Sequence, residues 1–225
     1  MSGWNLPVLI DHTVLKPDAT KADVLRLCEE AKANWFTVIF VPPCYVDEAV
    51  AAVAGTNIHV GIPIGFPLGG HTTNTKVAEA MEAVNRGATV LDMVLNISRL
   101  KSGDHQYVRT DIAEVVKATP LAEHKVIFET CYLTQEEKRT ACHLVMEAGA
   151  DYVKTSTGFG PAGATVADVR LLKEVVAGKV KVKASGGIRD WKTTLAMLEA
   201  GADRIGTSAS LKIIDEWRAS HNKQG

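Results

Sequence analysis

The 225-residue chain, with 46% hydrophobic residues and a formal net charge of −1 at pH 7, can form a large core and offers no basic surface for nucleic acid. No apolar stretch approaches the roughly 20 residues that cross a bilayer, and the N-terminal MSGWNLPVLIDHT lacks the basic region and long apolar run of a signal peptide. The four cysteines form neither a CxxC pair nor a regular framework, so we expect a reduced, cytoplasmic protein without membrane contact.

Short β-rich runs alternate with helical patterns along the chain. Strands are predicted at 8–11, 36–41, 59–64, 90–95, 125–130, 152–156, 181–185 and 204–207. Helices are predicted at 21–33, 45–54, 73–85, 107–118, 134–148, 165–176, 190–200 and 208–218. Thr20, ahead of Asp23, is a candidate N-cap for the first of these helices.

Eight strand-then-helix units predict a parallel sheet, because apolar strands joined by helices are buried on both faces. Eight such units in a chain of this length fit a (β/α)₈ TIM barrel, and the alternative is a doubly wound open sheet. The joints RGATVLDMV, EAGADYVKT and EAGADRIGT form a mild internal repeat, with a glycine between helix and strand. No linker or low-complexity tract divides the chain, so we expect one TIM-barrel domain over residues 1–225.

Two lysines end predicted strands in successive strand-helix units. Lys154 lies in ADYVKTSTGFG, and Lys183 lies in KVKASGGI. The ordinary role of such a lysine is to extend its charge into water. Burial makes that charge costly, however, so either lysine could instead be a neutral amine that attacks a carbonyl.

Magnitudes favour a division of labour between the two lysines. Lowering an amine pKa from 10.4 to about 7 takes roughly 4–5 kcal/mol. A second ammonium about 5 Å away contributes on the order of 3 kcal/mol at an effective dielectric near 20. Desolvation at the strand end can supply the remainder. One lysine is therefore expected to be the nucleophile, and the other to lower its pKa.

The carboxyl ends of the strands form the working face of such a barrel. Besides the lysines, this rule selects Asp11, Thr13, Asp92, Glu129, Thr130 and Ser208. Asp92 lies inside the apolar run VLDMVL, where a carboxylate must be paired. It is either a structural partner of a lysine or a proton shuttle beside the amine.

Two glycine-containing turns suit an anion. Gly186 and Gly187 follow the seventh predicted strand, and Gly206-Thr207-Ser208 follows the eighth, with Ser208 predicted to open the last helix. Phosphate sites in these barrels commonly lie after strands seven and eight, although a glycine pair alone is usually only a turn. The seven histidines are scattered without ligand spacing, so no metal site is expected.

These residues lie in motifs that resemble one family over nearly the whole chain, the deoxyribose-phosphate aldolases, which are class I (Schiff-base) aldolases. The motifs are LIDHTVLKPDAT, IGFPLGGHTTNTKVAEA, LDMVLNISRLKSGD, FETCYLT, AGADYVKTSTGFGPAGAT, VKASGGIRD and RIGTSAS. VKTSTGF followed by a second strand-end lysine before GGIR is highly specific.

The resemblance implies reversible cleavage of 2-deoxy-D-ribose 5-phosphate to acetaldehyde and D-glyceraldehyde 3-phosphate, in deoxynucleoside catabolism, without a metal or organic cofactor. It implies that Lys154 forms the Schiff base, that Lys183 lowers its pKa, and that Asp92 assists proton transfer. Phosphate contacts are implied for Gly158, Gly186, Gly187 and Ser208, and contacts near the sugar for Asp11 and Thr13. Barrels of this family often pair, which suggests a homodimer.

The chain departs from many relatives at three places. Ala209 stands where they have a second serine, which removes one possible phosphate contact. Phe40 stands in the second strand where they read VCVNP, and we expect this to leave catalysis intact. The HNKQG tail lacks the tyrosine with which some relatives end.

Three alternatives to this reading of the sequence are open. A related aldolase could act on another phosphorylated sugar, an isomerase or epimerase could use Asp92 as its base, or a sugar-phosphate binding protein could have lost turnover.

Overall fold

The computed structural model describes residues 4–222, so residues 1–3 and 223–225, which include both ends of the expected domain and most of the tail that lacks tyrosine, lie outside the described part. The strands are β1 Ile10–Thr13, β2 Val38–Phe40, β3 His59–Ile64, β4 Val90–Val94, β5 Glu123–Ile127, β6 Tyr152–Lys154, β7 Lys181–Ser185 and β8 Arg204–Thr207. The α-helices are α1 Leu6–Leu9, α2 Lys21–Asn34, α3 Val46–Ala52, α4 Thr73–Asn85, α5 Ile97–Lys101, α6 His105–Ala118, α7 Gln135–Ala148, α8 Val166–Val176, α9 Trp191–Glu199 and α10 Ser210–Asn222. Two short 3₁₀ helices are η1 Pro43–Tyr45 and η2 Thr130–Tyr132.

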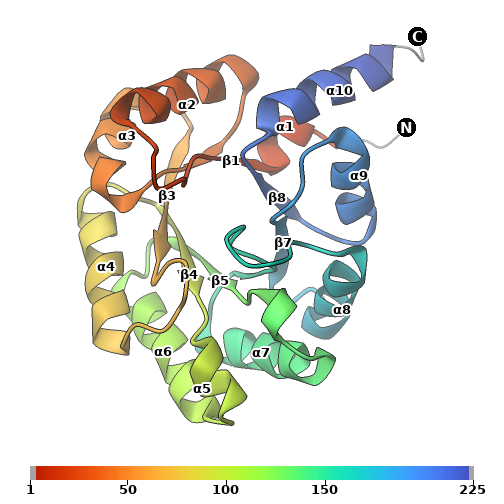
Figure 1. The fold of residues 1–225 in the computed structure, drawn as a ribbon. Coiled ribbons are helices and arrows are strands. Elements are labelled where there is room, and N and C mark those ends of the chain that lie inside the picture. The colour runs from red at the N-terminus through yellow and green to blue at the C-terminus, as the bar shows by residue number, and fades with distance from the viewer. Residues whose placement is uncertain (1–3, 223–225) are drawn as a thin grey trace.

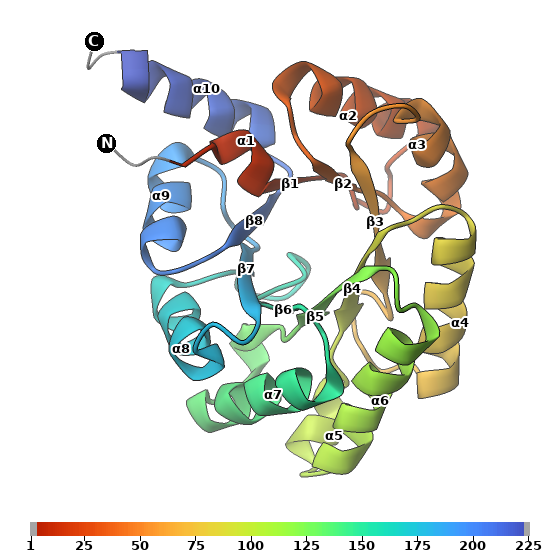
Figure 2. The ribbon, with the colours of Figure 1, turned by 180° about the vertical axis from the view of Figure 1, so that it is seen from behind.

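Within residues 4–222, eight parallel strands close into a barrel in sequence order, with β8 pairing back onto β1. The α-helices form a ring outside the strands (Figures 1 and 2). The predicted TIM barrel is therefore confirmed, and the open-sheet alternative is wrong.

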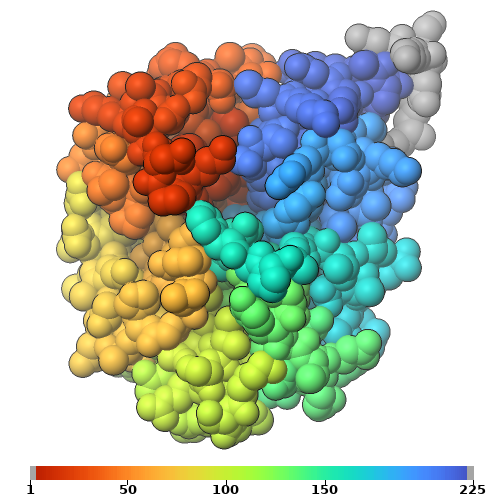
Figure 3. Space-filling view, in the orientation of Figure 1, coloured from red at the N-terminus to blue at the C-terminus, as the bar shows by residue number. Residues whose placement is uncertain are grey.

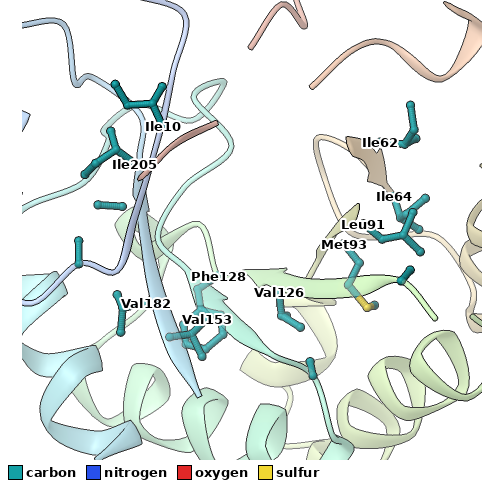
Figure 4. Close-up of a cluster of buried hydrophobic side chains, with 14 of the residues drawn as sticks. Ile10, Ile62, Ile64, Leu91, Met93, Val126, Phe128, Val153, Val182 and Ile205 are labelled. Carbon is teal, nitrogen blue, oxygen red and sulfur yellow. The ribbon is translucent and has the colours of Figure 1, made fainter. Parts of the chain in front are cut away.

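The strands separate two apolar regions. Outward-facing side chains such as Ile62, Leu91 and Val153 join the main core between strands and helices (Figure 4). A much smaller cluster of Val38, Phe40 and Val90 is distinct from it. Since side chains alternate across a strand, these three residues occupy the inward positions of β2 and β4. Elsewhere the inward positions are largely charged, which is unusual for a barrel interior.

Sequence patterns located several element ends well. β3, α4, β7 and β8 have the predicted bounds. Thr20 caps α2 in a reciprocal capping box, in which its hydroxyl accepts from the Asp23 amide and the Asp23 side chain accepts from the Thr20 amide. The glycine of the joint EAGADYVKT, Gly149, has φ 83° at the C-cap of α7.

The first predicted strand is wrong at its start. Val8 and Leu9 belong to the short helix α1, and β1 runs from Ile10 to Thr13. Pro7 lies in the first turn of α1, where its fixed φ favours a helix and its missing N–H costs nothing.

Other differences from the predicted elements bear on the site. Strand β5 ends at Ile127, before the left-handed Glu129, so Glu129 and Thr130 lie in the following turn. The last helix begins at Ser210, so Ser208 precedes it and does not open it as predicted. Helix α5 was not predicted.

No helix in the described chain is long and apolar enough to cross a membrane. All four cysteines are free thiols, and Cys28 and Cys142 are buried in the helix layer, where burial raises the pKa of Cys142 to about 12.

Candidate active site

The centre of the barrel holds two lysines on one carboxylate. Lys154 and Lys183 are register partners on β6 and β7, and both amines donate to Oδ2 of Asp92, at 2.7 and 2.6 Å. The Asp92 side chain is fully buried, as its place in VLDMVL requires. The two lysines therefore meet, as the sequence predicts, and Asp92 is ion-paired. Lys154 ends β6 as expected, but Lys183 lies in the middle of β7 rather than at its end.

The two lysines differ in their access to the surface. Lys154 lies on the wall of a cavity of about 300 Å³ at the carboxyl ends of the strands, whereas the Lys183 side chain is 1% exposed beneath that wall. Only an amine that reaches the cavity can meet a ligand. This difference separates the two lysines, which spacing along the sequence could not do.

The pKa of Lys154 is lowered to about 8. Burial is the largest cause, the Asp92 charge opposes it, and the Lys183 ammonium lowers the pKa further. The neighbouring cation thus acts in the direction that the sequence predicts. The relative size of the two contributions differs from the expectation, however, because burial lowers the Lys154 pKa more than Lys183 does.

Lys183 remains a cation. Burial alone would lower its pKa, but the charges and hydrogen bonds of Asp11 and Asp92 outweigh burial and raise it. Asp11 lies 2.5 Å from the Lys183 amine and 2.7 Å from Arg204 of β8. Asp11 is fully buried, one inward position below Thr13, so it binds Lys183 and lies below the cavity wall rather than on it.

Phe40 lines the same cavity and lies against both lysines. The Lys183 amine lies 4.1 Å from the ring centroid, and the Lys154 amine lies 5.6 Å from it. Gly61 on β3 makes room for the ring, because a Cβ there would lie 2.5 Å from it. Similarly, a Cβ at Gly206 would lie 2.9 Å from Cε of Lys183. The ring excludes water from the amines, which accounts for part of their desolvation.

The predicted anion turns surround the same cavity. Gly158, Gly186, Gly187 and Ser208 line it together with Thr13, whereas Asp11, Asp92 and Lys183 lie below. Gly186 and Gly187 have φ values of 85° and 77°, a left-handed conformation that glycine adopts without strain. Figure 3 shows the segment between β6 and α8 lying across this face beside a hollow.

Glu129 and Thr130 do not line the cavity, and their contacts are with neighbouring parts of the chain. The Glu129 carboxylate accepts from both the amide and the hydroxyl of Thr157, so it fastens the loop that carries Gly158. Burial raises the pKa of Glu129. The Thr130 side chain is buried in η2, and its hydroxyl has no hydrogen-bond partner among the described residues.

Four charged residues at this site were missed by the sequence analysis. Lys16 and Arg189 are exposed residues on the cavity wall. In residues 4–222 neither has a carboxylate within ion-pair distance, which leaves both cations available. Lys125 and Arg204 face the barrel interior. Each of these two residues is a basic residue inside a β-favouring run. That pattern could have marked them, but periodicity alone does not say whether such a side chain is buried and ion-paired.

The arrangement offers a partly neutral amine on a cavity wall, a buried carboxylate and a cation behind it, and glycine turns with two cations at the rim. Such a constellation can attack a carbonyl and hold an anion. Among residues 4–222, no group of three His, Cys, Asp or Glu side chains could hold a metal ion.

Comparisons with known proteins place the chain among aldolases. Residues 6–215 match the family model described as DeoC/LacD family aldolase. The chain is 54% identical to a deoxyribose-phosphate aldolase of Caldanaerobacter subterraneus subsp. tengcongensis, over 98% of this chain and 95% of that protein. A putative deoxyribose-phosphate aldolase from Coccidioides immitis superposes with a TM-score of 0.93 at 43% identity, over 94% of this chain and 85% of the other. A deoxyribose phosphate aldolase from Aeropyrum pernix, described as a unique tetramer, gives 0.89 at 32% identity, over 95% and 91%.

Proposed function

The chain belongs to the deoxyribose-phosphate aldolases of the DeoC/LacD family and is an aldehyde-lyase. From that premise we propose that it reversibly cleaves 2-deoxy-D-ribose 5-phosphate through a Schiff base on Lys154. The products are acetaldehyde and D-glyceraldehyde 3-phosphate, and the reaction serves deoxynucleoside catabolism. The observation that supports this proposal most directly is the Lys154 amine, which has a lowered pKa and reaches the cavity.

Lys154 begins the reaction as a nucleophile. Its neutral amine attacks the C1 aldehyde of the open-chain sugar, and loss of water gives a protonated imine. That imine draws electrons from the bond between C2 and C3. As this bond breaks, the C3 hydroxyl loses its proton and becomes the aldehyde of glyceraldehyde 3-phosphate. The enamine left on Lys154 takes a proton at C2, and hydrolysis releases acetaldehyde and the amine.

Asp92 and Lys183 support the proton transfers. Oδ2 of Asp92 accepts from both amines, while Oδ1, 3.8 Å from the Lys125 amine, has no hydrogen-bond partner among the described residues and can accept a proton or a hydrogen bond from water. Lys183 remains a cation because Asp11 and Asp92 hold it. A fixed positive charge behind Lys154 favours the neutral amine before attack and stabilises the alkoxide formed on attack.

The phosphate is held at the other end of the cavity. The left-handed turn at Gly186 and Gly187 exposes backbone amides, and Ser208 adds a hydroxyl. Lys16 and Arg189 supply charge at the rim. Ala209 supplies no hydroxyl, so these two cations take a larger share of phosphate binding in this chain.

The experiment that tests the proposal is borohydride trapping with acetaldehyde, followed by peptide mass spectrometry. We expect a reduced two-carbon adduct on Lys154, with loss of retro-aldol activity in proportion to labelling. The Lys154→Met variant provides the control and should carry no adduct in that peptide. Label confined to other lysines would overturn the assignment.

The same experiment separates the alternatives. An isomerase or epimerase with Asp92 as base would resist borohydride inactivation. A binding protein would show no retro-aldol cleavage at all. An aldolase for another sugar would be trapped equally but would prefer a different phosphorylated substrate in a direct comparison of kcat/KM.

A further inference from the structure

A third lysine faces Asp92 from a different side of the barrel. Lys125 is the register partner of Asp92 on β5, and its side chain is fully buried. Its amine lies 3.8 Å from Oδ1 of Asp92, the oxygen that neither Lys154 nor Lys183 contacts. The Asp92 carboxylate therefore has cations at both of its oxygens.

The other end of this contact lies away from the cavity. The Lys125 amine donates to Oε1 of Glu123 at 2.5 Å, and it lies 5.0 Å from the centroid of the Tyr152 ring. Glu123 begins β5, so it belongs to the amino-terminal end of the barrel, and its side chain is 31% exposed. A line of charges thus runs from Glu123 through Lys125 and Asp92 to Lys154.

We propose that Lys125 is a positioning residue that keeps the Lys154 amine uncharged by competing for Asp92. Its ammonium neutralises part of the carboxylate charge that would otherwise favour a protonated Lys154, and it adds direct repulsion across the barrel. The inference rests on the proposed function for the role of Lys154, but the charge effect itself needs no substrate. Lys125 also contributes to the lowered pKa of Asp92, after burial, which opposes the shift, and the larger effects of Lys154 and Lys183.

Charged and titratable groups reach this cluster from six strands and one turn. They are Asp11 on β1, Asp92 on β4, Glu123 and Lys125 on β5, Tyr152 and Lys154 on β6, Lys183 on β7, Arg204 on β8, and Glu129 in the turn after β5. Lys183 forms ion pairs with Asp11 and Asp92, and Arg204 forms an ion pair with Asp11. Lys125 is distinct because its charge is shared between Asp92 and a partner that lies farther from the cavity.

Competitive acetylation tests the proposal without relying on aldolase activity. The intact protein is labelled with a trace of acetic anhydride at a series of pH values, and the Lys154 peptide is quantified by mass spectrometry. We expect Lys125→Met to move the midpoint of Lys154 labelling upward by at least about one pH unit, because a unit charge within about 9 Å changes a pKa by that amount at an effective dielectric near 20. Lys125→Arg should restore the wild-type midpoint because it keeps the charge.

Lys76 provides a matched control. It is also fully buried and paired, donating to Asp111 at 2.6 Å and to the Val94 carbonyl at 2.9 Å, but it lies in the helix layer. Lys76→Met should lower stability without moving the Lys154 midpoint. An unchanged midpoint in folded Lys125→Met, or an equal shift in folded Lys76→Met, would overturn the proposal. If Lys125→Met does not fold, the same criterion applies to Lys125→Gln.

The two proposals fail in different ways. Absence of borohydride trapping on Lys154 counts against the Schiff base, whereas the acetylation midpoint reports only the charge environment of the amine. A shifted midpoint accompanied by an equal shift in the acid limb of kcat/KM would support both proposals at once.

Discussion

Lys154 and Lys183 stand opposite one another in the register of two adjacent parallel strands and share one oxygen of Asp92. Both side chains point into the barrel, where their amines meet Asp92, while the alternate residues of the two strands face the helices. Their difference arises from depth, since only Lys154 reaches the cavity. The contrast predicts different outcomes for the two substitutions.

Lys154→Met should abolish turnover while leaving the fold intact. We expect kcat to fall by at least roughly 10³-fold, because the other lysine that lines the cavity, Lys16, is exposed and makes no hydrogen bond to Asp92 among the described residues. Below pH 8 the folded protein bears the cost of a protonated, desolvated amine, since the pKa is about 8. The thermal midpoint at pH 7 should therefore be no lower than that of the wild type. Near-wild-type kcat in the variant would exclude Lys154 as the nucleophile.

Lys183→Leu should leave a slow enzyme whose acid limb moves to higher pH. Loss of the neighbouring cation raises the pKa of Lys154 from about 8, so a smaller fraction of the amine is neutral at any given pH. The measurement is kcat/KM from pH 6 to 10, with Lys183→Arg as the charge-keeping control. Because burial is the largest cause of the lowered Lys154 pKa, we expect that pKa to stay below its ordinary value in the variant. An identical pH profile would refute the tuning role.

Phe40→Leu tests the contribution of burial without touching a polar group. A smaller side chain admits water from the cavity to the lysines, and burial is the main cause that lowers the Lys154 pKa. The acid limb of kcat/KM should again move upward, and unfolding should cost about 1 kcal/mol less than in the wild type. The control is Phe36→Leu, a fully buried ring outside the barrel interior. A shifted profile in both variants would argue against a local effect.

Arg189→Ala and Lys16→Ala should each weaken recognition of the phosphate. Both cations line the cavity rim, so KM for 2-deoxyribose 5-phosphate should rise on the order of 10-fold in each variant. The unphosphorylated sugar serves as the internal control, and its kcat/KM should change little. Equal losses on both sugars would mean that these residues shape the cavity rather than bind phosphate.

The strands and helices could be predicted from the sequence because caps and apolar runs depend on residues that are close together in the chain. The capping box at Thr20 and the apolar runs of β3 and β7 each depend on neighbouring residues. Helix α1 was missed because Val8 and Leu9 favour a strand by composition, while Pro7 and the buried Leu6 place the segment in a helical turn.

The charge network depends on register between strands, which the sequence does not display. Asp11 was expected near the sugar, yet the pairing of β1 with β8 places it below the cavity, against Lys183 and Arg204. Lys125 could not be linked to Asp92 until β4 and β5 were aligned. The meeting of Lys154 with Lys183 was predictable only because both lysines lie near the carboxyl ends of successive apolar runs.

Gly61 and Gly206 hold open the space in which an aromatic ring and a lysine tail lie. The shape of the reacting centre is thus partly encoded by positions that have no side chain, one of which, Gly206, also lines the cavity. An alanine at either position would press on Phe40 or Lys183, so a one-carbon change on the barrel wall would alter reactivity as well as packing. In a comparison of natural variants, these two wall positions would count among the determinants of catalysis.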